Sequence, residues 1–185
     1  APALALGSMV HLAAMHHYRR HAGLDALDPT EAMRQAPASI AHQYSAAVAV
    51  WAAYLARVEA TGADDGIEVL DVEREFEARI GGRLITARLD LVYAGAGGKV
   101  IVCDHKTAGG DLAAEIRSYE ESGQVALLDV FGAHVVAPIY GRAYGGVEIN
   151  AVGTAGQDPV VVRRLVTPPR AWPACGRAPM RSISS

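Results

Sequence analysis

The sequence predicts a mixed α/β fold, because a run of alternating apolar and polar residues in its middle lies between segments with helical character. Hydrophobic residues make up 51% of the 185 residues and charged residues 20%, a composition typical of globular domains. Alanine-rich segments favour helix, and valine-rich segments favour strand. The length suits one domain with a sizeable core, which we expect to span residues 1–185.

The first sixty residues predict helices. Residues 7–21 carry a stripe of apolar side chains at helical spacing. Asp28 is suited to cap a short second helix, since Pro29 follows it at the first helical position. Residues 39–60 predict one long helix that ends at Gly62, a residue type typical of helix C-termini.

The middle of the chain predicts an antiparallel meander of three strands. Residues 67–80 and 83–93 form a hairpin across the turn Gly81-Gly82, and a second turn at 94–98 leads into a strand at 99–106. The central strand alternates, with one apolar face and one polar face: Ile85, Ala87, Leu89 and Leu91 against Thr86, Arg88 and Asp90.

The last third predicts one further helix and two returning strands. The helix is expected over residues 111–131, although Gly123 weakens its middle. Valine-rich segments at 146–153 and 159–166 predict strands. From Thr167 the tail is rich in Pro, Arg and Ser and is expected to be irregular.

Composition narrows the classes of protein. No stretch reaches the roughly 18 apolar residues of a membrane span, and the N-terminus lacks the pattern of a secretory signal, so we expect no membrane association. Two cysteines, Cys103 and Cys175, are too few for an iron–sulfur cluster and form no zinc motif, and Cys103 lies in an apolar strand-like run, so we expect a reducing, cytoplasmic location. The formal net charge of −3 implies that any contact with nucleic acid comes from a local patch.

Charged residues gather at the ends of two neighbouring predicted strands. Asp104 and Lys106 are two apart in a strand and therefore point to the same face. The turn at 94–98 brings Asp90 within about two positions of Asp104, a separation at which two carboxylates can bind one hard cation. A magnesium ion bound there would activate a water, and Lys106 would orient that water or stabilise the developing charge.

The segment TARLDLVYAGAGGKVIVCDHKTAGG resembles the core of PD-(D/E)XK nucleases, and within them RecB-like and phage-type exonuclease domains. Those families have an Asp at a strand end, a hairpin, and hydrophobic residues leading into Asp-x-Lys-Thr. Asp90 matches the first Asp, and Asp104, Lys106 and Thr107 match the second block. The resemblance implies a restriction-endonuclease-like mixed sheet flanked by helices, metal binding (Mg²⁺ or Mn²⁺) by Asp90, Asp104 and the His105 carbonyl, and a catalytic Lys106.

Three further positions fit the same resemblance. The sequence GSMVH at 7–11 is similar to an early helix in which Gly-x-x-x-His supplies an active-site His, which indicates His11 as a metal ligand. Gln124 matches a site Gln on the helix after the Lys, whereas Leu128 stands where a Tyr is expected. Glu73 resembles an upstream Glu and is a possible further site residue. The expected activity is metal-dependent hydrolysis of DNA phosphodiester bonds, preferably as an exonuclease.

Two alternatives stay open at this point. The fold could serve as a DNA-binding or protein-interaction module with a weakened site, an alternative that the missing Tyr and the acidic charge balance favour. The chain could also be the nuclease part of a larger assembly with a helicase or recombination protein. A histidine pair, His17 and His21, has the spacing of a zinc site but shows no third ligand in the sequence, so ordinary helix residues are the preferred interpretation.

Overall fold

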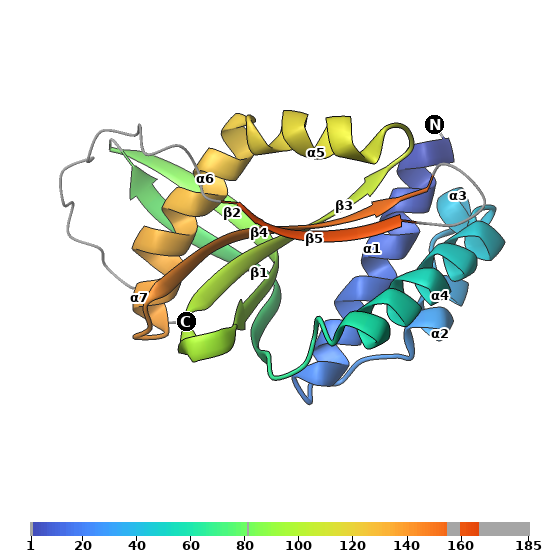
Figure 1. Cartoon of the computed structure of the whole chain (residues 1–185), viewed down its shortest axis with the longest axis horizontal. Coiled ribbons are helices and arrows are strands. Elements are labelled where there is room, and N and C mark those ends of the chain that lie inside the picture. The colour runs from blue at the N-terminus through green and yellow to red at the C-terminus, as the bar shows by residue number, and fades with distance from the viewer. Residues whose placement is uncertain (1, 81, 155–159, 167–185) are drawn as a thin grey trace.

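A computed structural model describes residues 2–80, 82–154 and 160–166 (Figure 1). The helices and strands follow one another along the chain as α1 (Pro2–His21), α2 (Pro29–Arg34), α3 (Ala38–Ala41), α4 (Tyr44–Thr61), β1 (Glu68–Ile80), β2 (Arg83–Ala94), the short 3₁₀ turn η1 (Ala96–Gly98), β3 (Val100–Ala108), α5 (Leu112–Glu120), α6 (Gly123–Phe131), the π-helical turn η2 (Gly132–Val136), α7 (Ala137–Ile139), β4 (Tyr144–Gly153) and β5 (Val160–Val166).

The described strands form one mixed sheet in the order β1-β2-β3-β4-β5. The pairs β1–β2, β2–β3 and β4–β5 are antiparallel, while β3 and β4 are parallel. A parallel pair needs a crossover connection, and the segment from α5 to α7 provides it. The predicted meander, the returning strands and the mixed sheet are therefore confirmed.

Helices cover both faces of this sheet, as Figure 1 shows. Alternate residues of β3 point to opposite faces. Val100 and Val102 belong to the larger core cluster, together with Ile116 of α5 and Phe131 of α6. On the other face, Ile101 and Cys103 pack against Tyr18 of α1. A third cluster joins α1 and α4 to β4 through Val152.

The alternation of β2 breaks at Leu91, contrary to the prediction. Leu89 belongs to the cluster under α5 and α6, but Leu91 packs with Tyr18 on the α1 face. The break lies beside an irregularity in β1. Glu73, between the register pairs Arg74–Leu89 and Val72–Leu91, has a φ of 55°, a left-handed conformation that is rare for a residue with a Cβ. Simple two-residue periodicity therefore does not extend past this point.

Two predicted long helices are each interrupted. The helix expected over 39–60 is α3 followed by α4, and the break lets Ile40 and Tyr44 both pack against the cluster that joins α1 and α4. The helix expected over 111–131 is α5 followed by α6, and the two axes are bent by 59°. The first helix ends at Glu120, and Ser122 caps α6 by accepting a hydrogen bond from the backbone N–H of Val125, so that Gly123 is the first residue of the second helix.

The predicted helix ends and the hairpin are confirmed. The Asp28 side chain accepts hydrogen bonds from the backbone N–H groups of Thr30 and Glu31, and Gly62 ends α4 in the left-handed conformation. The register pair Ile80–Arg83 leaves two residues for the β1–β2 turn, of which Gly81 lies outside the described residues. The irregular tail expected from Thr167 also lies outside them.

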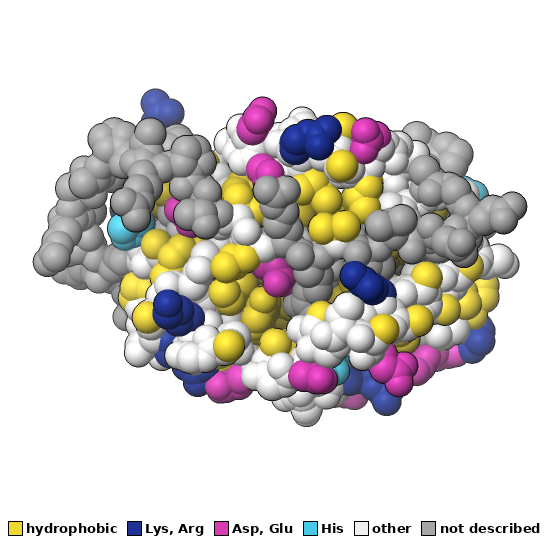
Figure 2. All heavy atoms as spheres, viewed as in Figure 1, with side chains coloured by type: hydrophobic (Ala, Val, Ile, Leu, Met, Phe, Trp, Pro, Cys, Tyr) yellow, Lys and Arg dark blue, Asp and Glu magenta, His cyan; other side chains and the backbone are white. Residues whose placement is uncertain are grey.

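The surface mixes charges of both signs. On the face shown in Figure 2, lysine and arginine side chains of the described residues lie singly among acidic ones, with apolar side chains visible between them. Among the described helices, no single one is long and apolar enough for a membrane span, although the bent pair Leu112–Glu120 and Gly123–Ile139 passes that test together.

Phe131 tests how much the larger core cluster contributes to stability. Its side chain is fully buried, so Phe131→Ala is expected to lower the free energy of unfolding by about 3–5 kcal/mol. Ile139 lies in the same crossover segment with 52% of its surface exposed, and Ile139→Ala is expected to change that free energy by less than about 1 kcal/mol. Urea unfolding followed by circular dichroism measures both; equal losses would contradict the assigned core.

Candidate active site

The β2–β3 ladder stops where the acidic residues begin. The last register pair is Leu91–Cys103, so the next position on this antiparallel pair falls to Asp90 and Asp104. The Asp90 carboxylate accepts a hydrogen bond of 2.8 Å from the backbone N–H of His105. The Asp90 side chain thus satisfies the His105 N–H, which has no partner in the β2–β3 ladder. The same hydrogen bond holds the Asp90 carboxylate against β3.

His11, Glu73 and Asp90 converge at this point from three elements. His11 of α1 hydrogen-bonds through Nε2 to Glu73, and its Nδ1 lies 3.8 Å from an Asp90 carboxylate oxygen. One ligand atom from each of the three residues lies within 4.8 Å of the others. The left-handed backbone of Glu73 is an outlier of the kind that clusters at functional sites.

Gly7 allows α1 to approach β3 closely enough for this arrangement. A Cβ atom at Gly7 would lie only 2.5 Å from the Thr107 hydroxyl oxygen. His11 is four residues further along the helix and therefore lies on the same face as Gly7. The Gly-x-x-x-His spacing seen in the sequence has this physical basis.

Asp104, Lys106 and Gln124 form a second group beside the first. The Lys106 ammonium lies 2.6 Å from Asp104 Oδ2, and the Gln124 amide of α6 donates to Oδ1 at 3.4 Å. Asp104 itself is 6% exposed. The Lys106 nitrogen also lies 4.6 Å from the centre of the Tyr119 ring, a distance typical of a cation–π contact.

The electrostatics of the two groups are coupled. The pKa of the Asp90 carboxyl group is raised to about 6, first by its burial and second by the negative charge of the nearby Asp104 carboxylate. The hydrogen bond that His11 donates to Glu73 is the largest cause of a raised pKa at His11, to which Asp90 and Asp104 also contribute. Burial, followed by the charge of Asp104, raises the pKa of the Tyr119 phenol. The carboxylates therefore share a region in which negative charge is poorly solvated.

The main chain of His105 faces this same region. Within a strand, the N–H and C=O of one residue point to the same side, and the His105 N–H is directed at Asp90. Its carbonyl is consequently directed toward the gap between β2 and β3. The imidazole lies on the other face, where its ring stacks on Tyr18 with centroids 5.5 Å apart and its Nδ1 is 3.0 Å from the Asn150 amide.

A hollow of about 330 Å³ adjoins Lys106 beneath α5. Its wall includes Tyr119 and Ser122 from the crossover helices and Ile149 and Ala151 from β4. The apolar side chains of Ile149 and Ala151 thus line the hollow beside Lys106, and Glu115 of α5 adds a carboxyl group to its wall.

The donor set suits a divalent cation. Carboxylates of Asp90, Asp104 and Glu73 and the His105 carbonyl offer the oxygen ligands that Mg²⁺ prefers, and the His11 imidazole extends the set to Mn²⁺. When His11 is neutral, the carboxylates of Glu73, Asp90 and Asp104 have only Lys106 and Arg88 as charged partners among the ion pairs of the described residues, so a divalent cation would complete the charge balance.

All the side chains predicted for the site lie in these two groups. Glu73 was the site residue with the least support from the sequence, yet it forms the direct hydrogen bond with His11. Leu128, where a Tyr was expected, is a core residue, whereas Tyr119 on the preceding helix lies over Lys106. Sequence reasoning missed Tyr119 because the bend between α5 and α6 decides which helical residue faces Asp104.

Comparison with known proteins identifies the family of the chain. A family model described as the PD-(D/E)XK nuclease superfamily matches residues 1–165. No curated protein matches the chain significantly. Among solved structures, the crystal structure of SSO0001 is similar with 15% identity and a TM-score of 0.34, over 85% of this chain and 65% of that one. Because the family match covers most of the sequence and the mixed sheet carries helices on both faces, the fold is restriction-endonuclease-like and the chain belongs to the PD-(D/E)XK nuclease superfamily.

Proposed function

We propose that this chain is a metal-dependent deoxyribonuclease of the exonuclease kind, with Asp90, Asp104, Glu73 and His11 holding the metal and Lys106 acting on the reacting phosphate. One observation supports this most strongly. Acidic side chains from β1 and β2 meet His11 of α1 next to the Asp104–Lys106 pair, at the position where the β2–β3 ladder ends. A purely structural role would not require so many poorly solvated carboxylates in one place.

A bound Mg²⁺ or Mn²⁺ would supply charge stabilisation at the phosphate and a more acidic water. Asp90 and Asp104 are the ligands on β2 and β3, with the His105 carbonyl between them. His11 and Glu73 complete the set from α1 and β1. Gln124 orients Asp104 by its hydrogen bond to Oδ1, which leaves Oδ2 to Lys106.

Lys106 acts by position and charge. Its ammonium lies at the end of an apolar row on β3, between the Asp104 carboxylate and the Tyr119 ring. The contact with Tyr119 restricts the side chain to one side of Asp104, so that the ammonium faces the hollow beneath α5. There it would orient the attacking water or stabilise charge that develops on the phosphate oxygens.

DNA is the proposed substrate, bound through its backbone. Arg88 is 3.3 Å from Glu73 and largely exposed, so it is placed to contact a phosphate that enters the site. The net charge of −3 and the scattered basic residues in Figure 2 agree with local rather than broad electrostatic binding. A helicase or recombination partner, and a cytoplasmic location, stay predictions from the sequence.

Lys106→Ala tests the catalytic proposal directly, with Lys99→Ala as a matched control. The chain has two lysines, and Lys99 is exposed at the start of β3, away from the acidic groups. Digestion of a fluorescent DNA in Mg²⁺ is expected to slow about 100-fold or more for Lys106→Ala and to be unchanged for Lys99→Ala. Asp104→Asn and EDTA are each expected to abolish digestion. Equal digestion with and without EDTA would overturn the proposed mechanism, and no digestion under any condition would favour a binding module.

Asp90→Asn tests the electrostatic cost of the metal-free site. In the folded chain the carboxyl pKa is raised from 3.8 to about 6, so Asp90 favours the folded state while it is protonated and loses that contribution as the pH rises through 6. In EDTA, Asp90→Asn is therefore expected to gain about 2 kcal/mol relative to the unmutated chain between pH 4.5 and pH 7.5. Urea unfolding at the two pH values measures this difference.

An exposed carboxyl provides the control for that measurement. Asp25 lies in the loop after α1, and Asp25→Asn is expected to show the same stability difference at both pH values. Replacing EDTA by Mg²⁺ at pH 7.5 is expected to stabilise the unmutated chain more than Asp90→Asn, because a cation that binds only the folded state shifts the equilibrium. A pH-independent difference for Asp90→Asn would contradict the assigned environment.

A further inference from the structure

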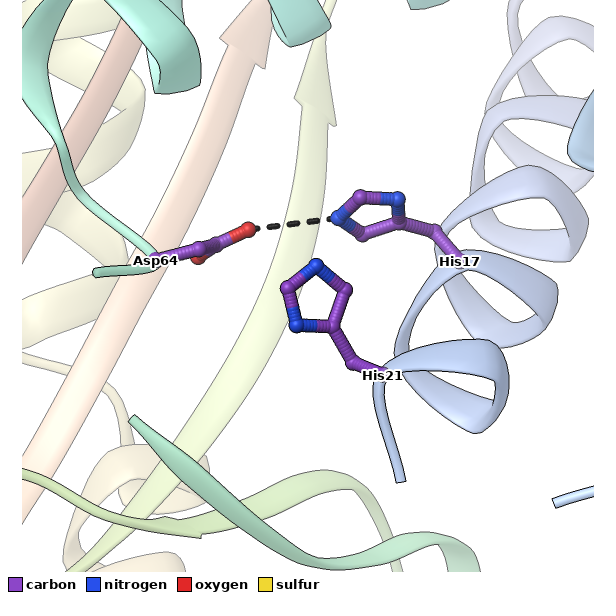
Figure 3. Close-up of side chains that lie close together, drawn as sticks. All are labelled: His17, His21 and Asp64. Carbon is purple, nitrogen blue, oxygen red and sulfur yellow. Dashed lines mark hydrogen bonds and ion pairs between the residues drawn. The ribbon is translucent and has the colours of Figure 1, made fainter. Parts of the chain in front are cut away.

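A second group of metal-ligating side chains lies at the C-terminal end of α1. His17 and His21 are one turn apart on the helix, and Asp64 approaches them from the connection between α4 and β1 (Figure 3). This group is distinct from the proposed active site, because His17 is six residues, or about 9 Å of helix, beyond His11. The third ligand that the sequence did not reveal is thus 43 residues away from His21.

The distances suit a small transition-metal ion. His17 Nε2 lies 3.2 Å from Asp64 Oδ2, and one ligand atom from each of the three residues lies within 4.8 Å of the others. Bonds of about 2.0–2.1 Å in a tetrahedral zinc site place neighbouring ligand atoms roughly 3.3 Å apart. Figure 3 shows the two imidazole rings on the α1 side of a gap and the Asp64 carboxyl group opposite them, and the ring centroids of His17 and His21 are 4.8 Å apart.

A hydrogen bond from Tyr18 fixes the orientation of the Asp64 carboxylate. The Tyr18 hydroxyl donates to Oδ1 at 3.2 Å, which leaves Oδ2 directed at His17. Because Tyr18 donates to Asp64, the Tyr54 hydroxyl at 2.6 Å must donate to Tyr18, and the Asn150 amide donates to Tyr54 at 2.8 Å. Such outer hydrogen bonds fix a ligand's orientation and raise its basicity in metal sites.

The charges around the group favour a cation. Asp64 is 9% exposed, and its buried carboxyl group lies beside the two imidazoles. His21 lies in the last turn of α1, where the helix dipole is negative, and His17 lies one turn before it. Two neighbouring bases are directed elsewhere: Arg19 donates to the Asp25 carbonyl, and His16 accepts a hydrogen bond from the Leu27 backbone.

We propose that His17, His21 and Asp64 bind Zn²⁺ or a similar divalent transition metal, with water as the remaining ligand. Two imidazole nitrogens and one carboxylate match the ligand preference of zinc, whereas Mg²⁺ prefers oxygen donors alone. The ion joins the end of α1 to the α4–β1 connection. It thereby fixes the helix that carries His11 without taking part in the reaction.

Zinc stoichiometry and cobalt spectra test this site without reference to nuclease activity. The full chain is stripped with a chelator, loaded with excess Zn²⁺, desalted and analysed for bound metal. His21→Ala and His17→Ala are expected to hold one zinc fewer than the unmutated chain and to bind the ion at least roughly 100-fold more weakly by calorimetry. With Co²⁺, the unmutated chain is expected to show the intense visible absorption of tetrahedral coordination, and both variants are expected to lose it.

His42→Ala is the matched control, because His42 is an exposed histidine in the break between α3 and α4. It is expected to keep the full zinc content and the cobalt spectrum. The His21 side chain is itself exposed, so unchanged far-ultraviolet circular dichroism separates loss of the ion from loss of the fold. Equal zinc content in His21→Ala and the unmutated chain would overturn the proposal and leave His17 and Asp64 as an ion pair. Failure of DNA digestion would bear only on the active site.

Discussion

The end of the β2–β3 ladder is the constraint on which the site depends. A continued ladder would place Asp90 opposite Asp104, and the His105 N–H would have a carbonyl partner on β2. Instead the strands part, and the Asp90 side chain takes over that donor. The separation of β2 and β3 also opens the gap toward which the His105 carbonyl is directed. The end of the ladder therefore provides room for a metal ion and directs the Asp90 carboxylate and the His105 carbonyl toward it.

The helix α1 supplies what the sheet alone lacks. It brings His11 to Glu73 and Asp90, while Tyr18 on the same helix packs against the face of the sheet that carries Cys103 and His105. Gly7 sets the distance of closest approach, because any side chain there would meet Thr107. The position of one helix therefore determines the ligand set, and its two ends are fixed by different contacts: a close backbone approach at Gly7 and the polar group around Asp64.

Local patterns in the sequence were sufficient for most of the fold. The alternation of β2, the cap at Asp28 and the glycine at 62 depend on neighbours in the chain, and each is as predicted over most of its length. Interactions between distant segments were harder to predict. The left-handed Glu73 shifts Leu91 to the other face, and the bend at Ser122 brings Tyr119 rather than a residue near Leu128 to Lys106. Asp64 has no sequence signal, because only the packing of α4 against α1 places it beside His17.

The hydrogen bonds from Asn150 to Asp64 have a fixed direction. A carboxylate can only accept, so each group before it must donate onward, and the Asn150 amide is left to donate to His105 Nδ1 as well. An apolar substitution at one member would remove a hydrogen bond from this buried layer, at a cost of about 0.5–1.5 kcal/mol for each bond lost. The polar residues between α4 and the sheet are therefore coupled, because the donor role of each one is set by the residue that follows it toward Asp64.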